Sequence, residues 1–480
     1  MSSSFFFYDL ETSGFNPKEA RIMQFAGQRT DLQLRTIGEP HNYLIKLGDD
    51  VLPDPDAVLV TGITPQMTIA DGMSEAEFLK IFSTDIATPD TIFVGYNTVR
   101  FDDEFIRYIL YRNFYDPYEW QWQDGRSRWD ILDVVRMTRA LRPKGIKWPF
   151  DTNGNPTNRL ELITSLNGLD HANAHDALSD VNATIAVARL IRKHQPKLFD
   201  FLLGMRTKKS VMDLVSAGKP FVYTSGKYPS EFEKTTVVGV LGDHPQGQGA
   251  LVFDLRYDPE RFVDFDASEL AAAMSRRNDE PGPRLPVKSL KYNRCPAVAP
   301  LGVLDEECHK RLSLDASIYM NNYTKLQKVQ KKLAKGVGSA LQLLDKDFQT
   351  RLLESPQDVD GKLYDGFFDS ADKAQMGRVR NVSFEEIDKL SVEFHDPRLS
   401  ELLPLYKVRN FYKYMNDADR AFWEEFRERK LLGGGETSRA AKYFARLAEL
   451  VKKPDLTGEQ QYILEELQLY GQSVLPAKPD

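Results

Sequence analysis

The sequence predicts a protein of three domains: an α/β domain, a small all-β domain and a helical domain. A chain of 480 residues is too long for one ordinary hydrophobic core, so several domains are expected. Strand-like and helix-like runs alternate up to about residue 196, short strands follow, and helical periodicity dominates the last part. These three textures place the domains at residues 1–196, 197–352 and 353–480.

The first predicted domain alternates strands with helices. Short apolar runs at 5–8 and 91–96 have the length and composition of strands, and helical periodicity covers 104–111, 131–141 and 176–194. This alternation is typical of a sheet covered by helices, which is the α/β class.

The second predicted domain consists mainly of short strands at 221–224, 236–241 and 250–255, separated by segments rich in Gly, Pro and Asp. This pattern favours a small barrel or sandwich. Further on, 324–334 places lysines between apolar positions and predicts an amphipathic helix with a basic face. The simplest interpretation of that face is a solvated surface.

The third predicted domain begins after a linker-like stretch at 354–361. Helices are expected at 417–432 and 437–452. The three glycines between them, 433–435, are neither preceded by a strand nor followed by Lys and Ser or Thr. They therefore predict a break between two helices and not a phosphate-binding loop.

Composition and charge narrow the class of protein. Hydrophobic residues make up 41% of the chain, and no apolar run approaches the roughly eighteen residues that a membrane span needs. The N-terminal segment lacks the basic start of a signal peptide. The two cysteines, Cys295 and Cys308, are too few for a disulfide framework or a zinc site. We therefore expect a cytoplasmic protein. The net charge of −7 argues against bulk coating of nucleic acid but allows a local basic groove.

Two acidic residues stand at the end of the first predicted strand. Side chains alternate along a strand, so Asp9 and Glu11 share one face just before the turn at Gly14. Two neighbouring carboxylates are costly without a counter-charge, and hard cations prefer carboxylate oxygen. A metal site is one interpretation, and a pair of solvated turn acids is the other.

A second acidic position follows the strand at 91–96. Asn97 lies in a polar loop, and Asp102 and Asp103 stand where the next helix begins. Either acid could cap that helix, or one could face the site while its neighbour serves the helix. The spacing alone does not choose between them.

A third segment opens the helix at 176–194. His175 and Asp180 are separated there by about 7.5 Å of helical rise, which suits a proton acceptor beside a metal ligand. Taken singly, His175 could be an ordinary first-turn histidine and Asp180 an exposed helix acid.

Together the three segments supply four carboxylates and a histidine. Two-metal phosphodiester hydrolysis requires such a set, because acids hold the ions and another group takes a proton from water. We therefore expect two Mg²⁺ ions as the cofactor, with Mn²⁺ as a possible substitute.

The order of these motifs resembles the DEDD superfamily of 3′-to-5′ exonucleases in its histidine-containing branch. Longer strings narrow the resemblance to bacterial exonuclease I over nearly the whole chain: Val60-Thr-Gly-Ile-Thr-Pro65, Tyr111-Arg-Asn-Phe-Tyr-Asp-Pro117 and Ser127-Arg-Trp-Asp-Ile-Leu-Asp133. The resemblance implies a ribonuclease H-like α/β exonuclease domain, an SH3-like β-barrel domain and an α-helical C-terminal domain. It also implies Mg²⁺-dependent release of 5′-mononucleotides from the 3′ end of single-stranded DNA, in DNA repair and recombination.

The resemblance further assigns roles to the acids. It implies one ion among Asp9, Glu11 and Asp180, and a second ion held chiefly by Asp9. It selects Asp102 over Asp103 as the remaining metal-site acid, because the acid of the family motif directly follows a phenylalanine.

Two further roles concern the proton and the substrate. His175 is implied as the general base, since a pKa near neutrality suits proton removal. Glu11 is expected to contact the substrate as well as metal, and Arg159 is expected to touch the terminal phosphates.

Rings and cations interleave just after the second acidic motif, an arrangement that holds single strands through base stacking and phosphate pairing. The set is Arg107, Tyr118, Trp120, Trp122, Arg126, Arg128 and Arg136. Taken singly, such aromatics are mostly core and such arginines mostly surface. The DNA contacts expected first are Arg107, Tyr118, Trp122 and Arg136. A weaker extension in the second domain comprises Arg276, Arg277, Lys288, Lys291 and Arg294.

The resemblance also implies a protein partner, and two alternative functions stay open. The family acts alongside single-stranded-DNA-binding protein, and Arg142 is a candidate contact for the acidic tail of that partner. A monomer without membrane association is expected. The rivals are an exonuclease that prefers RNA and a noncatalytic scaffold whose acids have no chemical role.

Overall fold

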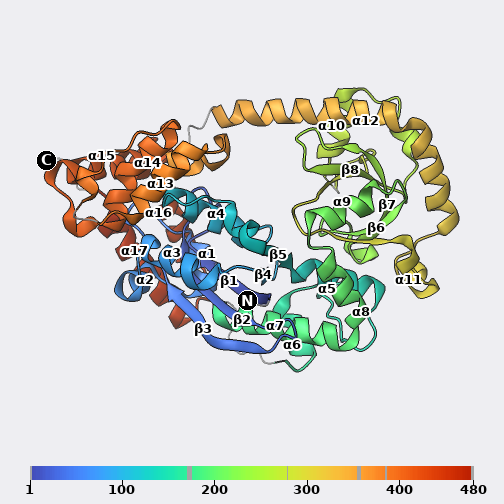
Figure 1. Cartoon of the computed structure of the whole chain (residues 1–480), viewed down its shortest axis with the longest axis horizontal. Helices are drawn as coiled ribbons and strands as arrows, with labels where there is room; N and C mark the ends of the chain where they lie inside the picture. Colours follow the sequence, from blue (N-terminus) through green and yellow to red (C-terminus); the bar gives the residue numbers. More distant parts are fainter. Residues whose placement is uncertain (1–2, 170–175, 278, 354–357, 384–385, 477–480) are drawn as a thin grey trace.

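The computed structural model of the chain describes residues 3–169, 176–277, 279–353, 358–383 and 386–476. Figure 1 shows an N-terminal α/β body, a β-rich body and a C-terminal group of helices, with one long helix running from the second to the third. The three predicted classes of domain are therefore present in the predicted order. Among the described helices, none is long and apolar enough to cross a membrane.

A five-stranded mixed sheet forms the centre of the α/β body, in the order β3-β2-β1-β4-β5. Strand β1 pairs antiparallel with β2 and parallel with β4, which in turn pairs parallel with β5. The strands are β1 Ser4–Thr12, β2 Ile22–Thr30, β3 Thr36–Leu44, β4 Thr91–Gly95 and β5 Ser127–Asp130. The strands predicted at 5–8 and 91–96 are thus β1 and β4.

Both faces of β1 are buried, because its side chains alternate between two hydrophobic clusters. Phe5 and Phe7 pack with residues of the helices on one face, among them Val181, whereas Phe6 and Tyr8 pack with another set on the opposite face. The helices of this body are α1 Pro55–Thr61, α2 Pro65–Asp71, α3 Glu75–Ile81, α4 Asp102–Arg112, α5 Ile131–Leu141, α6 Leu160–Leu166, α7 Ala177–His194 and α8 Pro196–Gly204. Odd-numbered positions of β1 therefore share the face that α7 covers.

The second body is built on a five-stranded antiparallel sheet in the order β10-β6-β7-β8-β9. Its strands are β6 Phe221–Thr224, β7 Thr235–Asp243, β8 Gly249–Asp254, β9 Val287–Lys291 and β10 Ala297–Pro300, with helices α9 Lys208–Ser216, α10 Ala267–Ser275 and α11 Glu306–Arg311. The three short strands expected from the sequence are β6, β7 and β8.

Helix α12, Ala316–Leu353, is much longer than the helix predicted at 324–334. Leu326, Leu333 and Val337 are buried against the second body, and α12 contacts β7 and α10. Lys328 and Lys331 are exposed on the other face, so the predicted basic face is a solvated one. Figure 1 shows α12 running along the outside of the β-rich body toward the C-terminal helices.

The C-terminal body is helical, as predicted. Helix α15 ends as its Gly433 N–H bonds the carbonyl of Arg429, and Gly434 has a left-handed backbone with φ of 95°. This confirms the predicted break between two helices. The helices are α13 Ser370–Asn381, α14 Pro397–Asn410, α15 Asp417–Leu432, α16 Arg439–Leu450 and α17 Gly458–Val474.

The α/β body and the C-terminal body share a buried ionic network. Asp360 of the C-terminal body accepts from Arg21 at 2.8 Å and from Arg409 at 2.7 Å. Asp50 of the α/β body accepts from Lys430 at 2.5 Å and from Arg409 at 2.7 Å. Because these partners are buried, the network fixes how the two bodies meet.

Candidate active site and nucleic-acid groove

Three carboxylates converge at the end of β1. Asp9 and Glu11 project from the face of β1 that α7 covers, and Asp180 lies in the first turn of α7. One carboxylate oxygen from each lies within 4.8 Å of the others. The alternation predicted for the strand therefore brings these acids together.

A glutamine of β2 ties the start of α7 to the sheet. Gln24 is the register partner of Glu11, and its Nε2 donates to Asp176 at 3.3 Å while its Oε1 accepts from the N–H of Ala177 at 3.4 Å. Asp176 in turn caps the helix by accepting from the N–H of Ser179 at 3.0 Å. These bonds hold the first turn of α7 beside β1, which sets the position of Asp180.

The adjacent acids Asp102 and Asp103 have different surroundings. Helix α4 begins at Asp102, and no side chain caps it at the preceding residue. Asp103 accepts from the hydroxyl of Tyr8 at 2.5 Å and pairs with Arg128, so its carboxylate is engaged within the fold. Asp102 is also buried, and its charge acts on Asp9 and on Glu11.

Burial and mutual repulsion raise the pKa values of the clustered acids. Burial raises the pKa of Glu11 to about 8, with Asp180 and Asp102 adding repulsion. Burial also raises the pKa of Asp102 to about 8 and that of Asp9 well above its usual range. The neighbouring charges that act on Asp9 are carboxylates, so a divalent cation fits this donor set and would remove the repulsion.

Protein-family models match three consecutive segments of the chain, one in each of the three bodies. The models that match are Exonuclease at residues 6–188, Exonuclease I SH3-like domain at 206–341 and Exonuclease I C-terminal domain at 357–474. The Exodeoxyribonuclease I of Haemophilus influenzae is 39% identical over 482 residues, which cover 98% of this chain and 99% of that protein.

The chain belongs to the exonuclease I family.

Solved exonuclease I structures share the whole fold. The enzyme from Methylocaldum szegediense has a TM-score of 0.91 and 39% identity, covering 99% of this chain and all of that one. Escherichia coli exonuclease I in complex with a dA16 oligonucleotide has a TM-score of 0.91 and 37% identity, again over 99% of this chain and all of the other. The β-rich body is therefore the SH3-like domain, and the α/β body is the ribonuclease H-like exonuclease domain.

Two further predicted site residues, His175 and Arg159, precede Asp180 along the chain. His175 falls outside the described residues. Arg159 stands directly before α6, where its side chain is 68% exposed and pairs with Glu161 at 2.7 Å.

A cavity of about 950 Å³ is lined by residues of all three domains. It includes five residues of the predicted interleaved set: Arg107, Tyr118, Trp122, Arg126 and Arg128. The ring of Trp122 is 63% exposed, and the guanidinium of Arg107 lies 6.0 Å from the ring centre of Tyr118. Lys291 and Arg294 of the SH3-like domain also line it. The exposed ring of Trp122 thus shares one surface with the exposed Lys291 and the partly exposed Arg294, an arrangement that suits single-strand binding, whereas Arg107 and Arg128 are buried there.

Other members of the predicted set lie elsewhere. Trp120 is buried in the exonuclease domain, where its ring packs 5.0 Å from that of Phe93. Arg136 is not among the described residues lining the cavity and pairs with Asp133 at 2.8 Å. Trp120 is therefore a core residue and not a stacking platform.

Residues of the C-terminal domain were not anticipated in the groove. Tyr364 and Phe367 line the cavity and are 53% and 82% exposed. Their rings lie 6.5 Å and 5.5 Å from that of Tyr118, measured between centres. The sequence shows a cluster of aromatics after the linker-like stretch, but such a cluster is as consistent with a core.

Proposed function

We propose that this protein removes 5′-mononucleotides one at a time from the 3′ end of single-stranded DNA, by Mg²⁺-dependent hydrolysis, in DNA repair and recombination. The observation that carries the proposal is the convergence of Asp9, Glu11 and Asp180 within 4.8 Å. The groove, which carries exposed rings and the cations Lys291 and Arg294, supports a single-stranded substrate.

The acids divide the work at the reacting phosphate. Asp9, Glu11 and Asp180 would hold the divalent ions, two Mg²⁺ in our proposal with Mn²⁺ as a substitute. Such ions activate water and stabilise the charge of the departing oxygen. Asp102 would complete the cluster, since the carboxylate of Asp103 is already engaged by Tyr8 and Arg128.

His175 would take part in proton transfer, and the groove residues would bind the DNA strand. We assign His175 as the general base that removes a proton from the attacking water. Glu11 and Arg159 would contact the terminal nucleotide, and Arg107, Tyr118 and Trp122 would hold the strand in the groove. Arg136, which is not among the described residues lining the groove, would contact the strand outside it. An E. coli exonuclease I–single-stranded DNA complex in its zinc-bound form, 37% identical with a TM-score of 0.91, supports both a divalent cation and this substrate.

Matched oligomers test the choice of substrate. Labelled single-stranded DNA and RNA of one sequence are digested with Mg²⁺, and the products are identified by chromatography. We expect 5′-mononucleotides from DNA at a much higher rate than from RNA. A clear preference for RNA would overturn the assignment of DNA.

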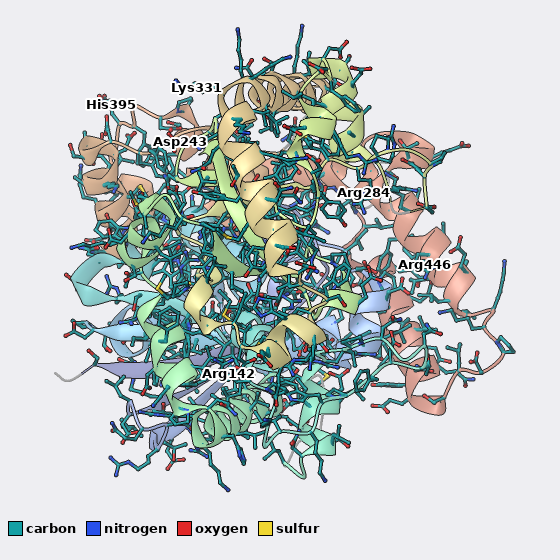
Figure 2. The ribbon with its side chains drawn as sticks, turned by 90° about the vertical axis from the view of Figure 1, so that its right-hand side faces the viewer. Arg142, Asp243, Arg284, Lys331, His395 and Arg446 are labelled. Carbon is teal, nitrogen blue, oxygen red and sulfur yellow. The ribbon has the colours of Figure 1, made fainter. Side chains whose placement is uncertain are left out.

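A partner also belongs to the proposal. A solved SSB/exonuclease I structure in complex with an inhibitor, 36% identical with a TM-score of 0.88, supports single-stranded-DNA-binding protein as a partner. Arg142, labelled in Figure 2, would contact its acidic tail. This arginine donates to the carbonyl of Val303 at 2.8 Å and is 34% exposed, so a neighbouring element holds it in place. We further propose a cytoplasmic monomer.

The tail contact is tested by titrating an acidic tail peptide into the wild type and Arg142→Ala. Weaker binding to the variant is expected. Unchanged peptide affinity would remove Arg142 from the proposed interface.

A further inference from the structure

We infer that Glu104 is a positioning residue that joins all three domains at the groove. Its carboxylate pairs with Arg294 until a phosphate of the DNA strand takes the place of that carboxylate. The inference rests on the proposed binding of single-stranded DNA in this groove. It adds a specific competitor for the strand, built into the protein.

Glu104 of α4 contacts each of the three domains. Its Oε1 accepts from Arg107 of the same helix at 2.5 Å and from Arg294 of the SH3-like domain at 2.8 Å. Its Oε2 accepts from the hydroxyl of Tyr364 of the C-terminal domain. All four residues line the same cavity, so one carboxylate links the domains at the surface proposed to hold DNA.

The two arginines differ in how firmly they are held. Arg107 is 7% exposed and also donates to Gln121 at 2.8 Å. Arg294 is 31% exposed, and its second contact is to the carbonyl of Val99 at 2.6 Å. Arg294 is therefore the cation that an entering phosphate can reach.

Carboxylate and phosphate compete for such a cation because both accept charge-assisted hydrogen bonds from a guanidinium. Glu104 is 15% exposed and ionised, since Arg107, Tyr364 and Arg294 keep its pKa below the usual value. In the DNA-free protein, Glu104 thus cancels one of the two positive charges beside it. Neutralising Glu104 would leave both charges available to the strand.

Salt-dependent DNA binding tests this competition. The affinity of a labelled oligothymidine is measured without divalent cations, over a roughly tenfold range of KCl, for the wild type and Glu104→Gln. Without the Glu104 charge, the strand meets one more net positive charge at this site, so the slope of log affinity against log salt should steepen by about 0.7, or about fivefold in affinity across that range. Glu104→Gln should therefore bind more tightly at low salt, with the difference shrinking as salt rises.

Two further variants assign the effect. Arg294→Gln added to Glu104→Gln should return the slope to the wild-type value, because the released cation is gone. Asp243→Asn serves as a matched control: Asp243 (Figure 2) is exposed in the same domain as Arg294 and forms no ion pair with the described residues. Its slope should equal that of the wild type.

The outcomes separate the inference from the proposed function. An unchanged or shallower slope in Glu104→Gln, with wild-type binding intact, would overturn the competition and leave DNA binding standing. The same gain in Asp243→Asn would also overturn it, because any lost negative charge would then suffice. A wild type that does not bind the oligomer would contradict the proposed function itself.

Discussion

Asp9 of β1 and Asp180 of α7 bring carboxylate oxygens within 4.8 Å of each other, although they come from opposite ends of the exonuclease domain. Glu11 joins them, and Asp102 and Asp176 add further negative charge that acts on Asp9. Such a cluster is stable as three anions only with a bound counter-charge, which makes it a metal site in the proposed chemistry.

Removing one acid of the cluster should weaken metal binding and slow cleavage together. Losing a group behind a metal ligand typically costs 10- to 100-fold, so Asp180→Asn, which removes a ligand itself, should lower activity by at least about 100-fold. Mg²⁺ titration by calorimetry and a rate assay measure both effects. Wild-type metal affinity and wild-type rate in this variant would exclude Asp180 from the site.

His175→Ala should separate proton transfer from binding. Loss of a general base typically lowers the rate by about 10²- to 10⁴-fold, whereas the metal ligands and the groove remain. Single-turnover kinetics and DNA titration distinguish the two. Near-normal turnover would remove His175 from the proposed role.

Mg²⁺ binding should strengthen as pH rises toward 8.5. Without metal, the pKa values of Glu11 and Asp102 are raised to about 8, so these acids hold protons that a cation must displace. Because these pKa values are raised in the folded state, the metal-free fold is stabilised by the protonated groups at low pH and loses that stabilisation as pH rises through about 8. The increase in Tm on adding Mg²⁺ should therefore be larger at pH 8.5 than at pH 6, and an equal increase at both would contradict the raised pKa values.

The buried network between the exonuclease and C-terminal domains should dominate the stability of their interface. Asp50→Asn leaves Lys430 without its 2.5 Å partner and should cost about 3–5 kcal/mol of unfolding free energy. Asp56→Asn is the matched control, because the pair of Asp56 with Arg446 (Figure 2) is about half exposed and worth at most about 1 kcal/mol. Denaturant unfolding compares them, and equal losses would count against the network.

The buried ionic network should lose its stabilising effect in acid. Arg409, Lys430 and Arg21 hold the pKa values of Asp50 and Asp360 below the usual range. Their stabilisation is thus complete above the ordinary aspartate pKa and is lost as pH falls below it. Asp50→Asn should accordingly lose less stability than the wild type between pH 5 and pH 3.

Trp122→Ala should weaken binding of single-stranded DNA. Its ring is 63% exposed in the groove, and a base–aromatic stack is worth about 1–3 kcal/mol. Tyr462→Ala is the control, since Tyr462 is 60% exposed on α17 and does not line the groove. Equal affinities for both variants would show that Trp122 is no stacking platform.

Periodicity predicted the elements whose burial is regular. Helix α5 was predicted with its observed limits, and β1 and β4 were found because their apolar runs are buried. Strand β3 was not predicted because it is an edge strand with mostly exposed residues and a proline, Pro40, so it lacks a hydrophobic pattern.

Site residues could be predicted where the residues that act together are close in the sequence. The pair Asp9 and Glu11 follows from strand alternation, whereas the different surroundings of Asp102 and Asp103 depend on Arg128, which only the folded chain brings near. Tyr364 reaches the groove through the packing of separate domains, which no local pattern encodes.

Digestion of a 5′-labelled single strand and its duplex, with Mg²⁺ and with EDTA, tests the polarity, the strand preference and the metal dependence of cleavage together. We expect a descending ladder from the single strand with Mg²⁺, little product from the duplex and none with EDTA. Immediate release of the labelled 5′ nucleotide, or equal cleavage in EDTA, would contradict the proposed function.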